Sequence, residues 1–142
     1  MRLVRRGRVV WEVLAIEDHR GSSVWTWLQA EADSGNRHAQ SMRDLIRHVL
    51  SNGPPKSPFL CDSLRDKIYE FKRGPKKGRK LRVLFFYDEG RVIVCTHAFW
   101  KDQRTAPAEI NKAVAMRRRY FDAKRSGDLE IREERDDVQQ SN

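Results

Sequence analysis

The sequence predicts an α+β domain of two layers, in which helices cover one face of a mainly antiparallel sheet and the other face stays open. Three observations predict this class. The apolar run VVWEVLAI at 9–16 is typical of a strand, residues 24–50 contain two stretches with helical spacing, and residues 68–100 contain three runs rich in β-branched and aromatic residues. A last helix completes the expected order β-α-α-β-β-β-α.

The two stretches of helical spacing are expected to form a helical hairpin that packs on the sheet. Ser22 or Ser23 can cap the first helix, and the polar cluster DSGN at 33–36 ends it. Gly53 and the two prolines after it end the second helix. Its apolar stripe follows the spacing i, i+3, i+4, i+7, i+8 and consists of Met42, Leu45, Ile46, Val49 and Leu50.

The runs KIYEFK, LRVLFFY and RVIVCTHAFW are expected to form a three-stranded antiparallel meander. Alternation predicts one shared face for four residues of its last strand, Ile93, Cys95, His97 and Phe99. A two-residue turn at 89–90 would place Arg82 directly opposite His97, whereas a three-residue turn would place Thr96 there. After the meander, Pro107 begins a C-terminal helix that ends near Gly127.

The charge is distributed unevenly along the chain. The formal net charge is +9, but residues 128–142 hold six acidic and two basic residues, and this balance of −4 leaves about +13 on residues 1–127. We therefore expect residues 1–127 to form one domain and residues 128–142 to be an acidic, disordered tail. A domain this cationic favours a polyanion such as nucleic acid, or an acidic protein partner.

Two further features indicate the setting of the protein. No apolar run approaches the length of a membrane span, so no membrane partner is expected. Cys61 and Cys95 lie far apart without the spacing of metal ligands, and two reduced thiols are typical of a cytoplasmic protein.

The meander carries the residue types that RNA cleavage without a metal requires. A base must take the proton of the 2′-hydroxyl, cations must stabilise the transition state, and an acid must protonate the leaving 5′ oxygen. Glu70 or a histidine could be the base, and His97 or a lysine of lowered pKa the acid. Arg82, Lys101 and Arg104 could stabilise the charge. Eight more basic residues are predicted to bind RNA: Lys72, Arg73, Lys76, Lys77, Arg79, Lys80, Arg117 and Arg118.

Each of these candidates also has a structural interpretation. Arg82 could form a structural ion pair with Glu70, and His97 could be a hydrogen-bonded core histidine. The basic loop RGPKKGRK at 73–80 could be only a flexible connection, and Arg117 and Arg118 could simply be exposed.

The stretch from IYEFK to AVAMRRRYF resembles the phage-derived, HigB-like branch of the RelE superfamily of toxins. The matching positions are Glu70, Lys72, Arg82, Gly90, His97, Phe99, Lys101 and Pro107. This resemblance implies a RelE-like fold and a type II toxin–antitoxin toxin that cleaves mRNA, often on the ribosome, without metal or cofactor. It also implies a helix-turn-helix antitoxin as the protein partner.

Two positions depart from that pattern, because Asp102 and Thr105 stand where the family usually has lysines. They support one alternative, an RNA-binding or interaction protein that has lost catalysis. A second alternative is a non-catalytic, ParE-like toxin that acts by binding gyrase. The set formed by Arg82, His97 and Lys101 favours the ribonuclease over the gyrase-binding toxin.

Overall fold

The computed structural model describes residues 1–8 and 10–133, and within these residues it is an α+β structure with three helices and one seven-stranded sheet. The elements in chain order are β1 (Arg2–Arg8), β2 (Glu12–Ile16), α1 (Val24–Asp33), α2 (Arg37–Asn52), β3 (Cys61–Ser63), β4 (Tyr69–Arg73), β5 (Lys80–Asp88), β6 (Val92–Lys101), α3 (Pro107–Ser126) and β7 (Glu130–Glu133). The predicted α+β class, the helical hairpin and the C-terminal helix are confirmed.

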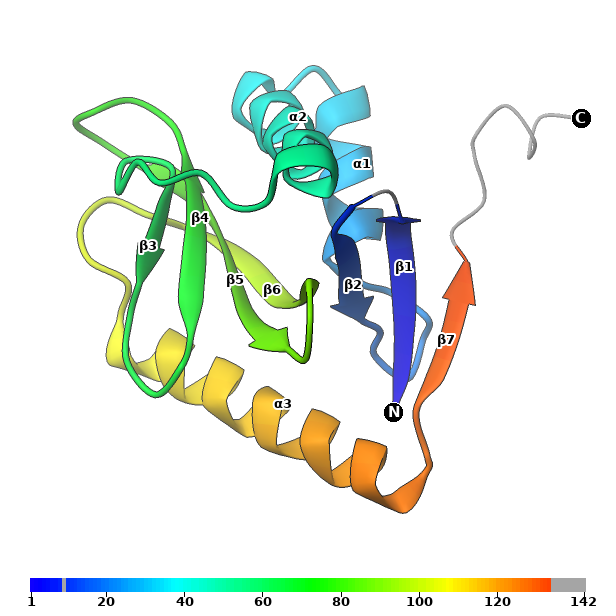
Figure 1. Cartoon of the computed structure of the whole chain (residues 1–142). Coiled ribbons are helices and arrows are strands. Elements are labelled where there is room, and N and C mark those ends of the chain that lie inside the picture. Colours follow the sequence, from blue (N-terminus) through cyan, green and yellow to red (C-terminus); the bar gives the residue numbers. More distant parts are fainter. Residues whose placement is uncertain (9, 134–142) are drawn as a thin grey trace, which may run out of the picture.

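The sheet is mixed and larger than predicted. Its strand order is β3-β4-β5-β6-β2-β1-β7, and β4, β5 and β6 form the predicted antiparallel meander. Beyond the meander, β2 runs parallel to β6 and β7 runs parallel to β1. The predicted first strand at 9–16 is only the second half of a hairpin, since residues 2–8 form a strand as well. Figure 1 shows the two halves of the sheet joined through β6 and β2.

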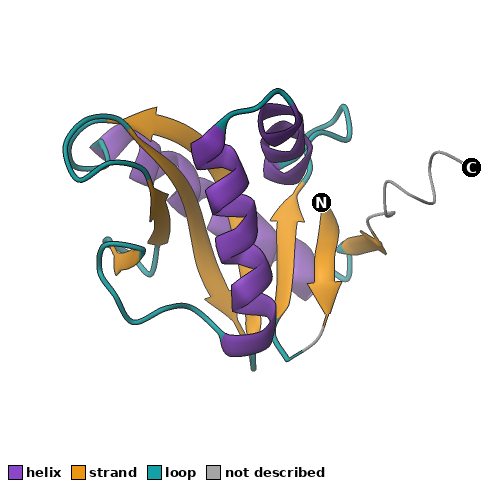
Figure 2. Cartoon of the chain, turned by 90° about the horizontal axis from the view of Figure 1, so that it is seen from above, coloured by secondary structure: helices purple, strands orange, loops and turns teal. Residues whose placement is uncertain are grey.

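Helices pack against both faces of this sheet, as Figures 1 and 2 show, so the predicted two-layer arrangement with one open face is wrong. The two core clusters share the strands but draw on different helices. Residues of α1 and α2 pack on the face that includes Phe71 and Phe85, and residues of α3 pack on the face that includes Leu84 and Phe86. Strand β5 is buried continuously from residue 81 to residue 86, which is typical of a strand covered on both faces.

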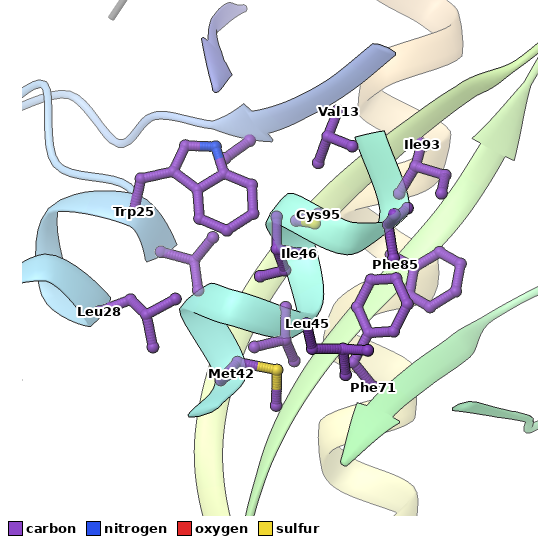
Figure 3. Close-up of a cluster of buried hydrophobic side chains, with 14 of the residues drawn as sticks. Val13, Trp25, Leu28, Met42, Leu45, Ile46, Phe71, Phe85, Ile93 and Cys95 are labelled. Carbon is purple, nitrogen blue, oxygen red and sulfur yellow. The ribbon is translucent and has the colours of Figure 1, made fainter. Parts of the chain in front are cut away.

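The larger cluster fixes the helical hairpin on the sheet (Figure 3). Met42, Ile46 and Val49 from the predicted stripe of α2 are at most 1 % exposed. Ser23 caps α1, with its side chain accepting a hydrogen bond from the Trp25 N–H. The buried stripe and the capping serine are the two local signals from which the helical hairpin is predicted.

The register of the β5–β6 hairpin differs from both predicted pairings. Asp88 pairs with Val92, so the turn spans residues 89–91 rather than 89–90 or the DEG at 88–90 that would pair Arg82 with Thr96. A bulge between Val83 and Phe85 then shifts the register further. Arg82 consequently lies opposite Phe99 rather than His97 or Thr96. The bulge also breaks the predicted shared face. Ile93 and Cys95 belong to the cluster under α1 and α2, whereas Phe99 packs in the cluster under α3 and His97 hydrogen-bonds to that helix.

The acidic tail contains a strand where disorder was expected. Residues 130–133 form β7, which pairs with β1, while residues 134–142 lie outside the described residues. Arg5 Nη1 lies 3.0 Å from Glu133 Oε1, and Arg132 Nε lies 2.6 Å from Glu17 Oε1. Because all four side chains of β7 are exposed, the strand gives no apolar alternation from which it could be predicted.

Two observations bear on the expected setting. In the described part of the chain, no helix is both long enough and apolar enough to cross a membrane. Both cysteines are free thiols; Cys95 is buried, and burial raises the pKa of the half-buried Cys61 to about 11.

Candidate nucleic-acid interface

A pocket of about 700 Å³ collects many of the predicted site residues. We call it the basic pocket. It is lined from β3, β4, the 73–80 loop, β5, the loop after β6 and the start of α3. Its charged lining consists of six basic residues, Arg65, Lys72, Lys76, Lys80, Arg82 and Arg104, and three acidic residues, Asp62, Glu70 and Asp102. The excess of cations makes this pocket a suitable binding site for phosphate groups.

The floor of the basic pocket is a buried ion pair between neighbouring strands. Arg82 Nη1 donates a hydrogen bond of 2.9 Å to Glu70 Oε1, and the residues are 5 % and 3 % exposed. The Thr105 hydroxyl donates to the other Glu70 oxygen, and Arg82 Nη2 donates to the Gln103 carbonyl oxygen. The structure therefore contains the ion pair between Arg82 and Glu70 that the sequence offered as the structural interpretation of these residues.

This network explains what the pair does for the pocket. Both Glu70 carboxylate oxygens accept hydrogen bonds, and both terminal nitrogens of Arg82 donate them. Two of the partners, Gln103 and Thr105, flank Arg104 in the loop after β6. The pair therefore holds this loop against the sheet and fixes the point from which Arg104 reaches the pocket.

Thr105 is central to that arrangement, although a threonine at this position departs from the pattern of the family that the sequence resembles. It is 7 % exposed, and its hydroxyl also lies 3.4 Å from Arg82 Nη1. A lysine in place of Thr105 would remove the hydroxyl that donates to Glu70. The other departure, Asp102, is exposed and lies 4.0 Å from Arg79 Nε.

The basic loop contributes part of its charge to the pocket. Lys76 and Lys80 line it, and Lys80 Nζ donates a 2.9 Å hydrogen bond to the Lys76 carbonyl oxygen, which links the end of the loop at β5 to its middle. Lys72 also lines the pocket, with its Nζ 3.8 Å from Asp62 Oδ2 and 4.0 Å from Glu70 Oε1. Five predicted residues of this region do not belong to the lining: Arg73, Lys77, Arg79, Lys101 and, from the next strand, His97.

Lys101 and His97 are placed differently from each other. Lys101 is exposed at the end of β6 and pairs across the sheet with Lys80, so it lies beside the rim of the basic pocket. His97 lines a separate hollow of about 630 Å³ between the β2–α1 connection and α3. Its Nε2 lies 2.7 Å from Glu109 Oε2, and its Nδ1 lies 3.1 Å from the Thr96 hydroxyl. The structure thus does not bring His97 together with Arg82.

Burial lowers the pKa of His97 below its ordinary value, and the hydrogen bond to Glu109 only partly opposes this effect. The unfolded chain then binds a proton more tightly than the folded protein does, so acidification from about pH 7.5 to about pH 5 should destabilise the fold through His97. We expect His97→Gln to lose less unfolding free energy over this interval than the wild type in urea titrations.

The matched control is His19→Gln, which removes an exposed histidine from the rim of the same hollow. This control should follow the wild-type pH dependence. Equal slopes for His97→Gln and the wild type would contradict the assignment of His97 as a buried, neutral histidine.

Arg117 and Arg118 lie at a third hollow, of about 470 Å³, between α3 and the β3–β4 connection. The guanidinium carbon of Arg117 is 4.8 Å from the centre of the Phe121 ring, a cation–π contact. The structure therefore does not bring these two arginines into the basic pocket, and their predicted role in RNA binding stays a prediction.

Nothing in the sequence indicated that Phe59, Asp62 and Arg65 would be among the residues that line the basic pocket. Asp62 lies on β3, a strand that no apolar run in the sequence predicts, and it is the cross-strand partner of Glu70. Arg65 reaches Asn111 on α3 with a hydrogen bond of 2.5 Å. Only the folded chain brings these residues next to the meander. In residues 1–8 and 10–133, no group of three or more histidine, cysteine, aspartate or glutamate side chains could hold a metal ion.

Comparison with known protein families places most of the chain in one of them. The family model described as phage derived protein Gp49-like (DUF891) matches residues 32–136. The match runs from the end of α1 into the tail and includes every charged residue that lines the basic pocket. No curated protein matches the chain.

Proposed function

The chain belongs to the Gp49-like family of phage-derived proteins, a family of RelE- and toxin-like proteins, and from this premise we propose that it is a toxin of a type II toxin–antitoxin system. The proposed activity is that of a HigB-like endoribonuclease that cleaves mRNA without a metal ion. One observation carries the proposal: five basic side chains surround a single pocket whose floor is the buried Arg82–Glu70 pair.

In the proposed reaction the 2′-hydroxyl of one nucleotide attacks the adjacent phosphorus, and the bond to the 5′ oxygen breaks. The products are a 2′,3′-cyclic phosphate and a 5′-hydroxyl. Lys72, Lys76, Lys80 and Arg104 stabilise the negative charge that develops on the phosphate oxygens. Arg82 and Glu70 act as positioning residues, because their polar atoms already bind each other and the loop that carries Arg104.

Proton transfer needs a carboxylate that the substrate can reach, and Glu70 is buried with both oxygens hydrogen-bonded. Asp62 has a side chain that is 50 % exposed, and it lies beside Lys72 in the pocket. We assign it the role of base for the 2′-hydroxyl in place of Glu70, with Lys72 returning a proton to the leaving 5′ oxygen. Lys101, at the rim beside Lys80, is assigned to binding of the flanking strand.

The partners follow from the same proposal. Messenger RNA, on the ribosome, is the substrate, and a helix-turn-helix antitoxin neutralises the protein. Charge complementarity supports an antitoxin that masks the basic pocket with acidic side chains, because this pocket carries twice as many basic as acidic residues.

Primer extension on messages from cells that express the protein tests this proposal. We expect growth arrest together with discrete breaks in the messages. Both should disappear in a Lys76→Gln/Arg104→Gln variant, which removes two exposed charges of the basic pocket. Growth arrest with intact messages would overturn the ribonuclease and favour a gyrase-binding toxin. Intact growth with RNA binding retained would favour a protein without catalysis.

A further inference from the structure

Phe59 is the most exposed large hydrophobic side chain in the described part of the chain, at 74 % exposure. It lines the basic pocket, where nine of the fourteen lining residues are charged. Exposing an aromatic ring to water has a free-energy cost that a binding partner would remove. The proposed phosphate-binding residues give no reason for an exposed aromatic ring beside them, so a ligand group other than phosphate would have to cover the Phe59 ring.

The backbone around Phe59 is fixed in place by local hydrogen bonds. The Phe59 N–H donates to Ser57 Oγ at 3.3 Å, and the Leu60 and Cys61 N–H groups donate to the Ser57 carbonyl oxygen. The Lys72 N–H donates to the Leu60 carbonyl oxygen at 2.8 Å, which attaches this turn to β4. The ring is thus presented from a constrained turn, so little backbone entropy is lost when it binds a partner.

We propose that Phe59 is the stacking surface for a base of single-stranded RNA whose phosphates bind the cations of the basic pocket. Sites for single-stranded nucleic acid combine a cationic groove with aromatic side chains on which bases stack. Phe59 supplies the aromatic ring, and Lys76, Lys80 and Arg104 supply the cations on the same pocket. This inference rests on the proposed function, because it names the form of RNA that the site accepts.

The surroundings of Phe59 favour a nucleic acid over a protein partner. A protein interface of ordinary affinity has a core of several apolar side chains. The other apolar residues of the basic pocket, Leu64 and Ile110, are half-buried and buried. Phe59 therefore stands alone among charged groups, which suits a flat base joined to phosphates. Stacking uses the face that all bases share, so the contact should be tolerant of sequence.

The test measures the affinity of the full chain for a fluorescent, single-stranded 2′-O-methyl RNA, which cannot be cleaved because the attacking hydroxyl is blocked. We expect Phe59→Ala to weaken binding by about 5- to 150-fold, and Phe59→Trp to bind at least as well as the wild type. Ile131→Ala is the control, since Ile131 is exposed on β7 and does not line the basic pocket. It should bind like the wild type.

A strand of the same length without bases separates stacking from charge. On this strand Phe59→Ala should bind as the wild type does, whereas Lys76→Gln/Arg104→Gln should still bind more weakly. If Phe59→Ala matched the wild type on the base-containing strand while the double variant lost affinity, stacking on Phe59 would be wrong. RNA binding by the cations of the basic pocket would still be supported. If the wild type bound neither strand, the inference would fall together with the proposed function. Unchanged RNA affinity with lost binding of a helix-turn-helix antitoxin would assign Phe59 to a protein interface instead.

Discussion

Replacement of Arg82 by methionine should lower the free energy of unfolding by about 3–5 kcal/mol, because it leaves Glu70 buried without its counter-ion. Methionine keeps the length of the aliphatic stem, so the loss comes chiefly from the charge and its hydrogen bonds. Glu70 is 3 % exposed and cannot recover hydration without opening β4 and β5. Urea titration followed by circular dichroism measures this change.

Two further variants decide whether the loss comes from the pair. Arg82→Met/Glu70→Leu removes both charges and should be more stable than Arg82→Met alone, since no unpaired charge remains. Arg104→Met removes an exposed arginine of the same pocket and should change stability by less than about 0.5 kcal/mol. Wild-type stability of Arg82→Met would contradict the structural role of the pair. Because Arg82→Met is expected to destabilise the fold, loss of toxicity in this variant would not by itself identify Arg82 as a catalytic residue.

The second large effect is expected on RNA affinity. Lys76→Gln/Arg104→Gln removes two cations from the basic pocket and should weaken binding of the 2′-O-methyl RNA strongly at low salt. If each residue contacts one phosphate, the slope of log affinity against log salt concentration should also fall by about 1.4, since single strands lose about 0.7 per contact. Fluorescence titrations at several salt concentrations measure both quantities.

The matched control for this double variant is Arg37→Gln/Arg119→Gln. It changes the net charge by the same amount, but its two arginines are exposed on α2 and α3 and do not line the basic pocket. We expect this control to keep most of the wild-type affinity and salt slope. Equal losses in the two double variants would show that RNA is attracted by the overall charge rather than by the pocket.

The helices and the meander could be predicted because each leaves a local signal. The stripe of α2 repeats at helical spacing, Ser23 and Gly53 mark the ends of helices, and Pro107 begins α3. The covered second face was missed for a physical reason. Phe86, like Phe85, is apolar and buried, and a strand buried on both faces gives no alternation from which the helix on its second face could be inferred.

The candidate site was predictable in its residue types and less so in its geometry. Arg82 and Glu70 were recognised as a potential pair because they lie on strands expected to be neighbours. Their further partner Thr105 belongs to a loop, where no periodicity indicates which way a side chain points. The offset of Arg82 from His97 depends on the turn at 89–91 together with one bulge in β6, and a bulge leaves no clear pattern in a single sequence.

Cleavage of an end-labelled, unmodified RNA by the purified protein in the presence of EDTA tests the central claim most directly, namely that the basic pocket is a metal-free ribonuclease site. We predict that the wild type and Arg37→Gln/Arg119→Gln leave 2′,3′-cyclic phosphate ends, and that Lys76→Gln/Arg104→Gln leaves the RNA intact while unfolding at the same urea concentration as the wild type. Wild-type cleavage rates in the pocket variant would contradict it, as would RNA that the wild-type protein leaves intact both free in EDTA and on ribosomes in a buffer that contains magnesium.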